Sequence, residues 1–187
     1  MKYVLSVLGF IILAVIAVTL LVSTTGNRTG EKLEGDKVVS LSDHKAAGSV
    51  IYTSQGSIVG DDQFRQVRIT VNQSERRVEL LAGYNGRVEK EQRFANNAQA
   101  FDVFMDALSK AGYSLERESA VDGPNGTCPL GRRFIYELRS GSENVVDLWS
   151  TSCGTKEGTF GGNATLVRQL FERQISEYNK FVSGVRF

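Results

Sequence analysis

The chain of 187 residues is poor in the side chains on which most metal sites and many active sites depend. It contains one histidine, two cysteines, one tryptophan and two prolines. A structural zinc site needs four ligands, usually cysteine and histidine at short spacings. A Ser-His-Asp triad needs a histidine held between an acid and a nucleophile. The only histidine, His44, follows Ser42 and Asp43 in a polar stretch, where neighbouring side chains point apart. We therefore expect no metal, no cofactor and no histidine-dependent catalysis.

Charge of one sign is also lacking. The sequence has 22 basic and 21 acidic residues, so removing Lys2 leaves 21 of each. Proteins that follow a phosphate backbone carry a basic stripe. The pairs Arg76-Arg77 and Arg132-Arg133 are better explained as exposed positions of strands. The composition predicts no nucleic-acid partner.

No charged residue occurs from Tyr3 to Ser23. About 20 apolar residues in a helix cross a hydrocarbon core of about 30 Å. We therefore predict that residues 1–23 form a retained transmembrane signal anchor, which contacts the lipid bilayer through residues 3–23. A cleaved signal peptide is the main alternative, but it has a shorter apolar core and a small-residue cleavage site. A pilin-type leader is disfavoured because Ala14 stands where such leaders usually carry glutamate.

The two cysteines, Cys128 and Cys153, flank a predicted β-hairpin with strands at 132–139 and 144–151. If Ser140-Gly141 form the centre of its turn, opposite positions sum to 281, as 128 and 153 do. The cysteines would then meet at the open end, although Pro129 and Gly131 are able to end the first strand before Cys128. The face that they share is predicted to carry Phe134, Tyr136, Leu138, Val145 and Trp149.

A disulfide between these cysteines bears on the location of the protein. It would close a loop of about 25 residues and stabilise the fold by roughly 3 kcal/mol. Lasting disulfides form in oxidising compartments, which predicts that residues 24–187 lie outside the cytoplasm. The flanking charges do not decide the orientation, because Lys2 alone precedes the span, whereas basic and acidic residues mix after it.

Residues 24–47 are polar and rich in glycine, which predicts a stalk, with Val38–Leu41 forming a short strand or docking on the domain. The folded domain is predicted at 48–187. Its first part contains strands at 50–53, 64–71, 75–82 and 88–94, since apolar and polar residues alternate there. The last of these strands is strongly charged, which is typical of a sheet edge.

Two helices complete the predicted domain. Asn96 or Asn97 caps the first, whose apolar stripe runs to Lys110. Asn163 caps the second, whose apolar face continues to Val182. We expect an α+β fold: an N-terminal transmembrane helix, then one domain with an antiparallel sheet of about five or six strands and two helices packed mainly on one face. The strand order does not follow from the sequence.

No motif in the sequence specifies a reaction. The glycine-rich loop at 154–162 precedes a helix but lacks the lysine and hydroxyl that a phosphate-binding loop places at the helix start. We predict a single-pass membrane-anchored extracytoplasmic domain that acts as a non-enzymatic binding module for a protein, a peptide or an envelope polymer. The candidate residues of its recognition loops are Asp122, Asn125, Lys156 and Phe160.

Two alternatives stay open. The first is an envelope hydrolase that uses carboxylates, which would require two of them to meet in a cleft; the candidates are Asp61, Asp62, Glu116 and Asp122. The second is a protease-inhibitor-like module that presents the loop 122–127, braced by Cys128.

Overall fold

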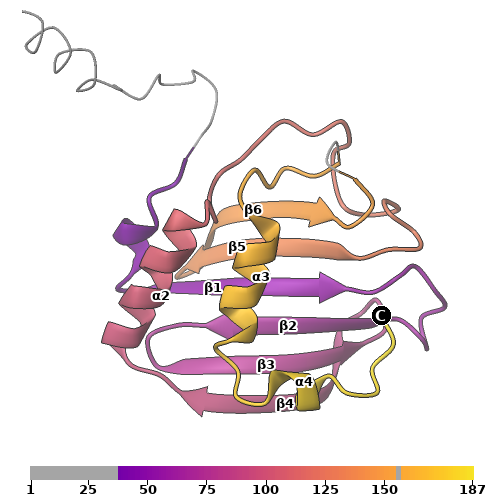
Figure 1. Ribbon diagram of the computed structural model, residues 1–187, viewed down its shortest axis with the longest axis horizontal. Coiled ribbons are helices and arrows are strands. Elements are labelled where there is room, and N and C mark those ends of the chain that lie inside the picture. The colour runs from indigo at the N-terminus through magenta and orange to yellow at the C-terminus, as the bar shows by residue number, and fades with distance from the viewer. Residues whose placement is uncertain (1–37, 155–156) are drawn as a thin grey trace, which may run out of the picture. The chain divides into compact units, whose positions relative to one another are not determined.

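The computed structural model describes residues 38–154 and 157–187 (Figure 1). It confirms an α+β fold with one six-stranded antiparallel sheet. In chain order the elements are η1 (Leu41–His44, a 3-10 helix), β1 (Gly48–Gln55), β2 (Arg65–Val71), β3 (Glu75–Ala82), β4 (Arg87–Ala95), α2 (Ala98–Lys110), β5 (Arg133–Ser140), β6 (Glu143–Thr151), α3 (Ala164–Glu172) and α4 (Tyr178–Phe181).

The predicted anchor, 1–23, lies outside the described residues. Within 38–154 and 157–187, no helix combines the length and apolar character needed to cross a membrane.

The sheet has the strand order β4-β3-β2-β1-β5-β6. The first four strands form a meander, because each pairs with the strand before it. The chain then passes through α2, and β5 pairs with the free side of β1. The charged strand β4 lies at one edge and is exposed along nearly its whole length, as its sequence predicts.

The helices α2, α3 and α4 lie on one face of the sheet (Figure 1). Strand residues that alternate toward this face are buried, among them Val50, Tyr52 and Ile69. The ring of Phe171, from α3, lies 5.5 Å from that of Tyr52 and 5.2 Å, edge-on, from that of Phe104 on α2. Apolar burial between sheet and helices therefore forms the core.

The first predicted helix is close to that observed. The Asn97 side chain accepts a hydrogen bond from the Ala100 amide, and Gly112 has a left-handed φ of 75° just after the helix. The second helix is shorter than predicted. It ends at Glu172, and Glu177 then adopts a left-handed φ of 57° before α4. The break directs Phe181, only 2% exposed, to the edge strand, where the Lys90 ammonium lies 4.5 Å from the centre of its ring.

The hairpin β5–β6 differs from the prediction by one residue. Arg139 pairs with Asn144 beside the turn, but Leu138 pairs with Val146, so Val145 is a β-bulge. A bulge inserts one residue into one strand and reverses its alternation beyond that point. The inner face therefore carries Val146 and Leu148, and Val145 at the bulge is partly buried and also packs against the core. The prediction that Trp149 shares this face was wrong, because Trp149 pairs with Ile135.

The described end of the predicted stalk docks on the domain. Leu41 is 2% exposed and belongs to the core. The Ser114 hydroxyl donates to the Val39 carbonyl, and the Lys45 ammonium lies 2.7 Å from the Asp106 carboxylate on α2. These contacts fix residues 39–45 against the helix α2 and the turn that follows it.

Candidate functional site

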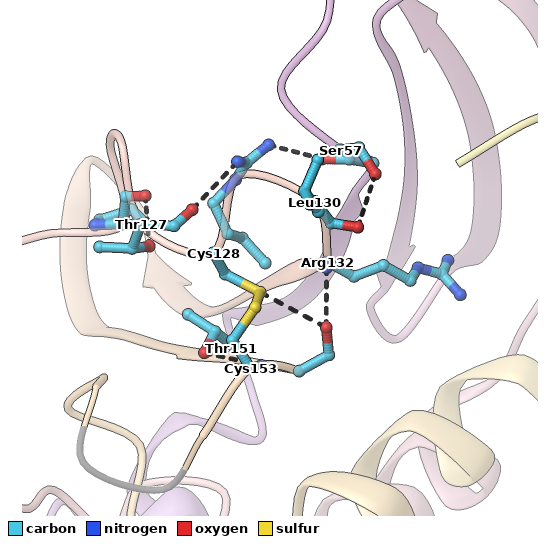
Figure 2. The surroundings of a disulfide bond; sticks show 11 residues. Ser57, Thr127, Cys128, Leu130, Arg132, Thr151 and Cys153 are labelled. Carbon is cyan, nitrogen blue, oxygen red and sulfur yellow. Dashed lines mark hydrogen bonds between the residues drawn. A yellow bond between two sulfur atoms is a disulfide. The ribbon is translucent and has the colours of Figure 1, made fainter.

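The predicted disulfide is present. Cys128 and Cys153 are bonded, with their Cα atoms 5.5 Å apart (Figure 2). Cys128 lies in a turn before β5, with a left-handed φ of 46°, and Cys153 follows β6. The turn at Pro129–Gly131 therefore precedes the strand, and the bond still closes the open end of the hairpin.

The segment around the disulfide is held to the neighbouring strands. The Ser57 hydroxyl donates to the Leu130 carbonyl, and the Ser152 hydroxyl accepts from the Arg132 amide (Figure 2). Arg133, 3% exposed, donates to the carbonyls of Gly56 and Thr127. Burial lowers the pKa of its guanidinium. These contacts fix the loops in place, which is a structural role.

The recognition-loop candidates lie in different environments. Asp122 and Asn125 are exposed on the loop 122–127. Phe160 is 3% exposed, and its ring stacks at 3.9 Å on that of Tyr136 in the core. Lys156 lies outside the described residues. Among the described candidates, Asp122 and Asn125 are therefore the two whose side chains are accessible for binding.

The four carboxylate candidates have separate surroundings. Asp61 accepts a hydrogen bond from the Tyr84 amide, which fixes the loop before β2 to the β3–β4 turn. Glu116 forms an isolated β-bridge with Phe160, and Asp122 is an exposed loop residue. Asp62 lines a cleft, described next. Within the described ranges, no three side chains among His, Cys, Asp and Glu are grouped to hold a metal ion.

A cleft of about 720 Å³ lies between the segment after β1 and residues 183–187. Its charged lining residues are Asp62, Arg65, Glu89 and Arg186. The Arg65 guanidinium and the Glu89 carboxylate form an ion pair at 2.8 Å. Two positive and two negative groups line the cleft, so it carries no net charge to select a charged ligand.

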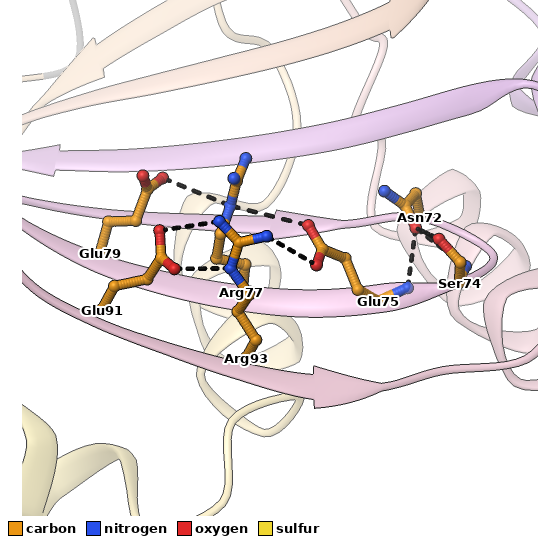
Figure 3. A network of polar contacts seen from close by, with 7 residues as sticks. All are labelled: Asn72, Ser74, Glu75, Arg77, Glu79, Glu91 and Arg93. Atoms are coloured by element: carbon orange, nitrogen blue, oxygen red, sulfur yellow. Dashed lines mark hydrogen bonds and ion pairs between the residues drawn. The ribbon is translucent and has the colours of Figure 1, made fainter.

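The other face of the sheet carries no helix among the described residues. We call it the open face. Its strand residues alternate with those of the core, and many are charged. Figure 3 shows part of it, where Arg77 on β3 lies 3.8 Å from Glu75 and 3.7 Å from Glu79. Arg93 on β4 pairs with Glu91 at 2.5 Å, and this hydrogen bond lowers the pKa of Glu91.

A second pocket, of about 340 Å³, lies on the open face over β1, β2, β3 and β5. Its lining includes three arginines and no carboxylate; the polar lining residues are Ser49, Arg68, Thr70, Arg77 and Arg139. Because the domain as a whole has balanced charges, three cations around one pocket are a distinctive local arrangement.

This pocket has no counterpart in the sequence prediction. Arg68, Arg77 and Arg139 are distant in sequence and form no motif. The alternation of 64–71 and 75–82 places Arg68 and Arg77 on one face, but only the strand order brings Arg139 beside them. The adjacent Arg76 points to the opposite face, where it donates to the Gln174 and Ala95 carbonyls.

No family model matches the chain, and no curated protein matches it in sequence. Function is therefore inferred from the geometry.

Proposed function

We propose that this protein is a single-pass membrane-anchored extracytoplasmic domain that acts as a non-enzymatic binding module of the cell envelope. The open face is its binding surface. One observation carries this assignment: a six-stranded sheet buries one face under helices and presents on the other a charged surface with an arginine-lined pocket. Charged and polar surfaces of this kind give specificity for a charged partner.

The location rests on two features. The run from Tyr3 to Ser23 has the length and apolar character of a membrane span. The disulfide between Cys128 and Cys153 requires an oxidising compartment to persist. Together they support a domain outside the cytoplasm, tethered at its N-terminal side.

The geometry gives the two alternatives less support. Carboxylate-dependent glycoside hydrolysis needs two carboxyl groups facing one bond, about 5–9.5 Å apart. Of the four candidates, Asp61 instead accepts from the Tyr84 amide and Asp122 is exposed on a loop. A protease inhibitor needs an extended, exposed loop. The loop 122–127 instead folds back, since both the amide and the hydroxyl of Thr127 donate to the Pro124 carbonyl.

Location is tested in cells that express the full chain and whose outer barriers have been opened without lysis. We expect added protease to degrade the folded domain and leave a small membrane-bound fragment. Protection of the domain until the membrane is lysed would contradict the proposed orientation.

Binding is tested by co-sedimentation of the full chain with washed envelopes, in non-ionic detergent. A charge swap on the open face, Asp147→Lys with Arg93→Glu, should weaken binding about tenfold or more, the loss of one good charged contact. The matched swap on the helix side, Asp106→Lys with Lys110→Glu, preserves the net charge equally and should have little effect. Equal loss in both variants, or no sedimentation of the unaltered chain, would contradict the proposal.

A further inference from the structure

We propose that the pocket lined by Arg68, Thr70, Arg77 and Arg139 binds an oxyanion, either a carboxylate or a phosphate group, carried by a sugar-sized ligand or by one residue of an envelope polymer. This inference rests on the proposed binding function and names the chemistry of its site.

The strand register brings the pocket residues together. Thr70 on β2 pairs with Arg77 on β3, and Arg68 pairs with Glu79. Arg68 and Arg77 are therefore diagonal neighbours on one face, a relation that places such positions about 7–8 Å apart. Arg139 on β5 pairs with Ser49 on β1 and approaches from the other side. Three guanidinium groups from three strands thus surround one pocket.

Nearby carboxylates neutralise these cations only in part. The Nε atom of Arg77 lies 3.8 Å from Glu75 and 3.7 Å from Glu79, beyond hydrogen-bond distance. Arg139 has a closer partner, since its guanidinium donates to Glu137 at 2.6 Å. Arg68 has no ion pair within the described residues. Arg68 and Arg77 therefore retain most of their N–H donors for a ligand.

Buried polar atoms without a hydrogen-bond partner lie beside this pocket. The described residues contain nine buried side-chain nitrogen or oxygen atoms without a hydrogen bond, and three belong to this pocket: Arg68 Nε, Thr70 Oγ1 and Arg77 Nε. Thr70 is 5% exposed. Buried polar groups in native proteins are nearly always paired. An oxyanion accepts several hydrogen bonds at once and matches the planar fork of arginine.

The size of the pocket limits the ligand. About 340 Å³ is near the lower end of small-molecule sites, which span roughly 300–1,000 Å³. A sugar acid or a sugar phosphate fits this range. The larger cleft beside residues 183–187 has twice the volume but a balanced charge, so it offers no comparable selection for an anion.

The test is titration calorimetry of the full chain in non-ionic detergent, with glucuronate, glucose 6-phosphate, inorganic phosphate and glucose as probes. We expect the anions to bind and glucose not to bind. Tighter binding of glucuronate assigns a carboxylate ligand, and tighter binding of the two phosphates assigns a phosphate ligand. Binding should weaken as salt is added, because the charges are partly exposed.

Three variants locate the site. Arg68→Gln should weaken binding of the anion about tenfold or more, as expected for losing a charge-assisted hydrogen bond. Arg173→Gln removes the same charge from an exposed position at the end of α3, on the helix side of the sheet, and it should change affinity by less than about twofold. Thr70→Val should weaken binding without lowering the melting temperature of the free protein, because it removes a buried hydroxyl that has no partner.

Several results would overturn the proposal. One is the absence of anion binding up to about 10 mM, since a weaker affinity would not mark a specific site. Another is an equal loss of affinity in Arg68→Gln and Arg173→Gln. The third is a Thr70→Val variant that loses stability and affinity together. If envelope binding persists while anions fail to bind, the anion pocket is refuted and the binding function stands. If anions bind but envelopes do not, the binding function is refuted and the anion pocket stands.

Discussion

Removing the disulfide should destabilise the domain by an amount that follows from its position in the chain. Cys128 and Cys153 are separated by 25 residues. In the chain-entropy model a crosslink over this separation stabilises the folded state by about 3.5 kcal/mol, because it restricts the unfolded chain. For a domain of this size that corresponds to a fall in melting temperature of about 7–14 °C. The perturbation is the double variant Cys128→Ala with Cys153→Ala, which avoids placing an unpaired hydroxyl in the buried position of Cys128.

The assay is urea unfolding of the full chain followed by circular dichroism. The free energy of unfolding should be compared after extrapolation to water. The uncrosslinked chain expands more on unfolding, so both the slope of this free energy against urea and the midpoint concentration change. The unaltered protein treated with reductant should lose the same free energy, and the double variant should not respond to reductant. A loss below about 1 kcal/mol would refute the view that this bond restrains the unfolded chain over the whole hairpin.

Two other perturbations test the core and its electrostatics. Phe171→Ala should cost about 3–5 kcal/mol in urea unfolding, since its ring is fully buried between the sheet and α2; a cost below about 1 kcal/mol would mean that α3 does not pack there. Burial raises the pKa of Glu172 above its ordinary value of 4.5, against the opposing effects of Arg168 and Arg132. The stability that protonated Glu172 allows is therefore fully present below pH 4.5, and it is lost as the pH rises through the raised pKa. Glu172→Gln should accordingly raise the melting temperature at pH 7 and not at pH 4, and a larger gain at pH 4 would contradict the assigned direction.

Local chemistry explains why much of the fold was predictable. The strand β3 was predicted with its observed bounds, and the alternation of Val67, Ile69 and Val71 identified the buried face of β2. The Asn97 cap and Gly112 marked the ends of α2 because cap and turn residues act over only a few positions.

The parts that were missed depend on longer-range contacts. The bulge at Val145 has no residue signature, yet it moved Trp149 to the other face. The break before α4 occurs at Glu177, a residue that rarely adopts a left-handed conformation. The arginine pocket combines strands β2, β3 and β5, so it required the strand order, which single-sequence periodicity does not provide.

The central claim is that the open face of the sheet contacts the partner. The direct measurement is carbodiimide labelling of the carboxylates in the full chain, with and without washed envelopes, read by mass spectrometry. We expect labelling to fall at Glu137 and Asp147, which pair across β5 and β6 on the open face, while Asp106 on α2 and Glu177 before α4 stay unchanged. Protection confined to Asp106 and Glu177, or equal labelling of all four with and without envelopes, would contradict the account.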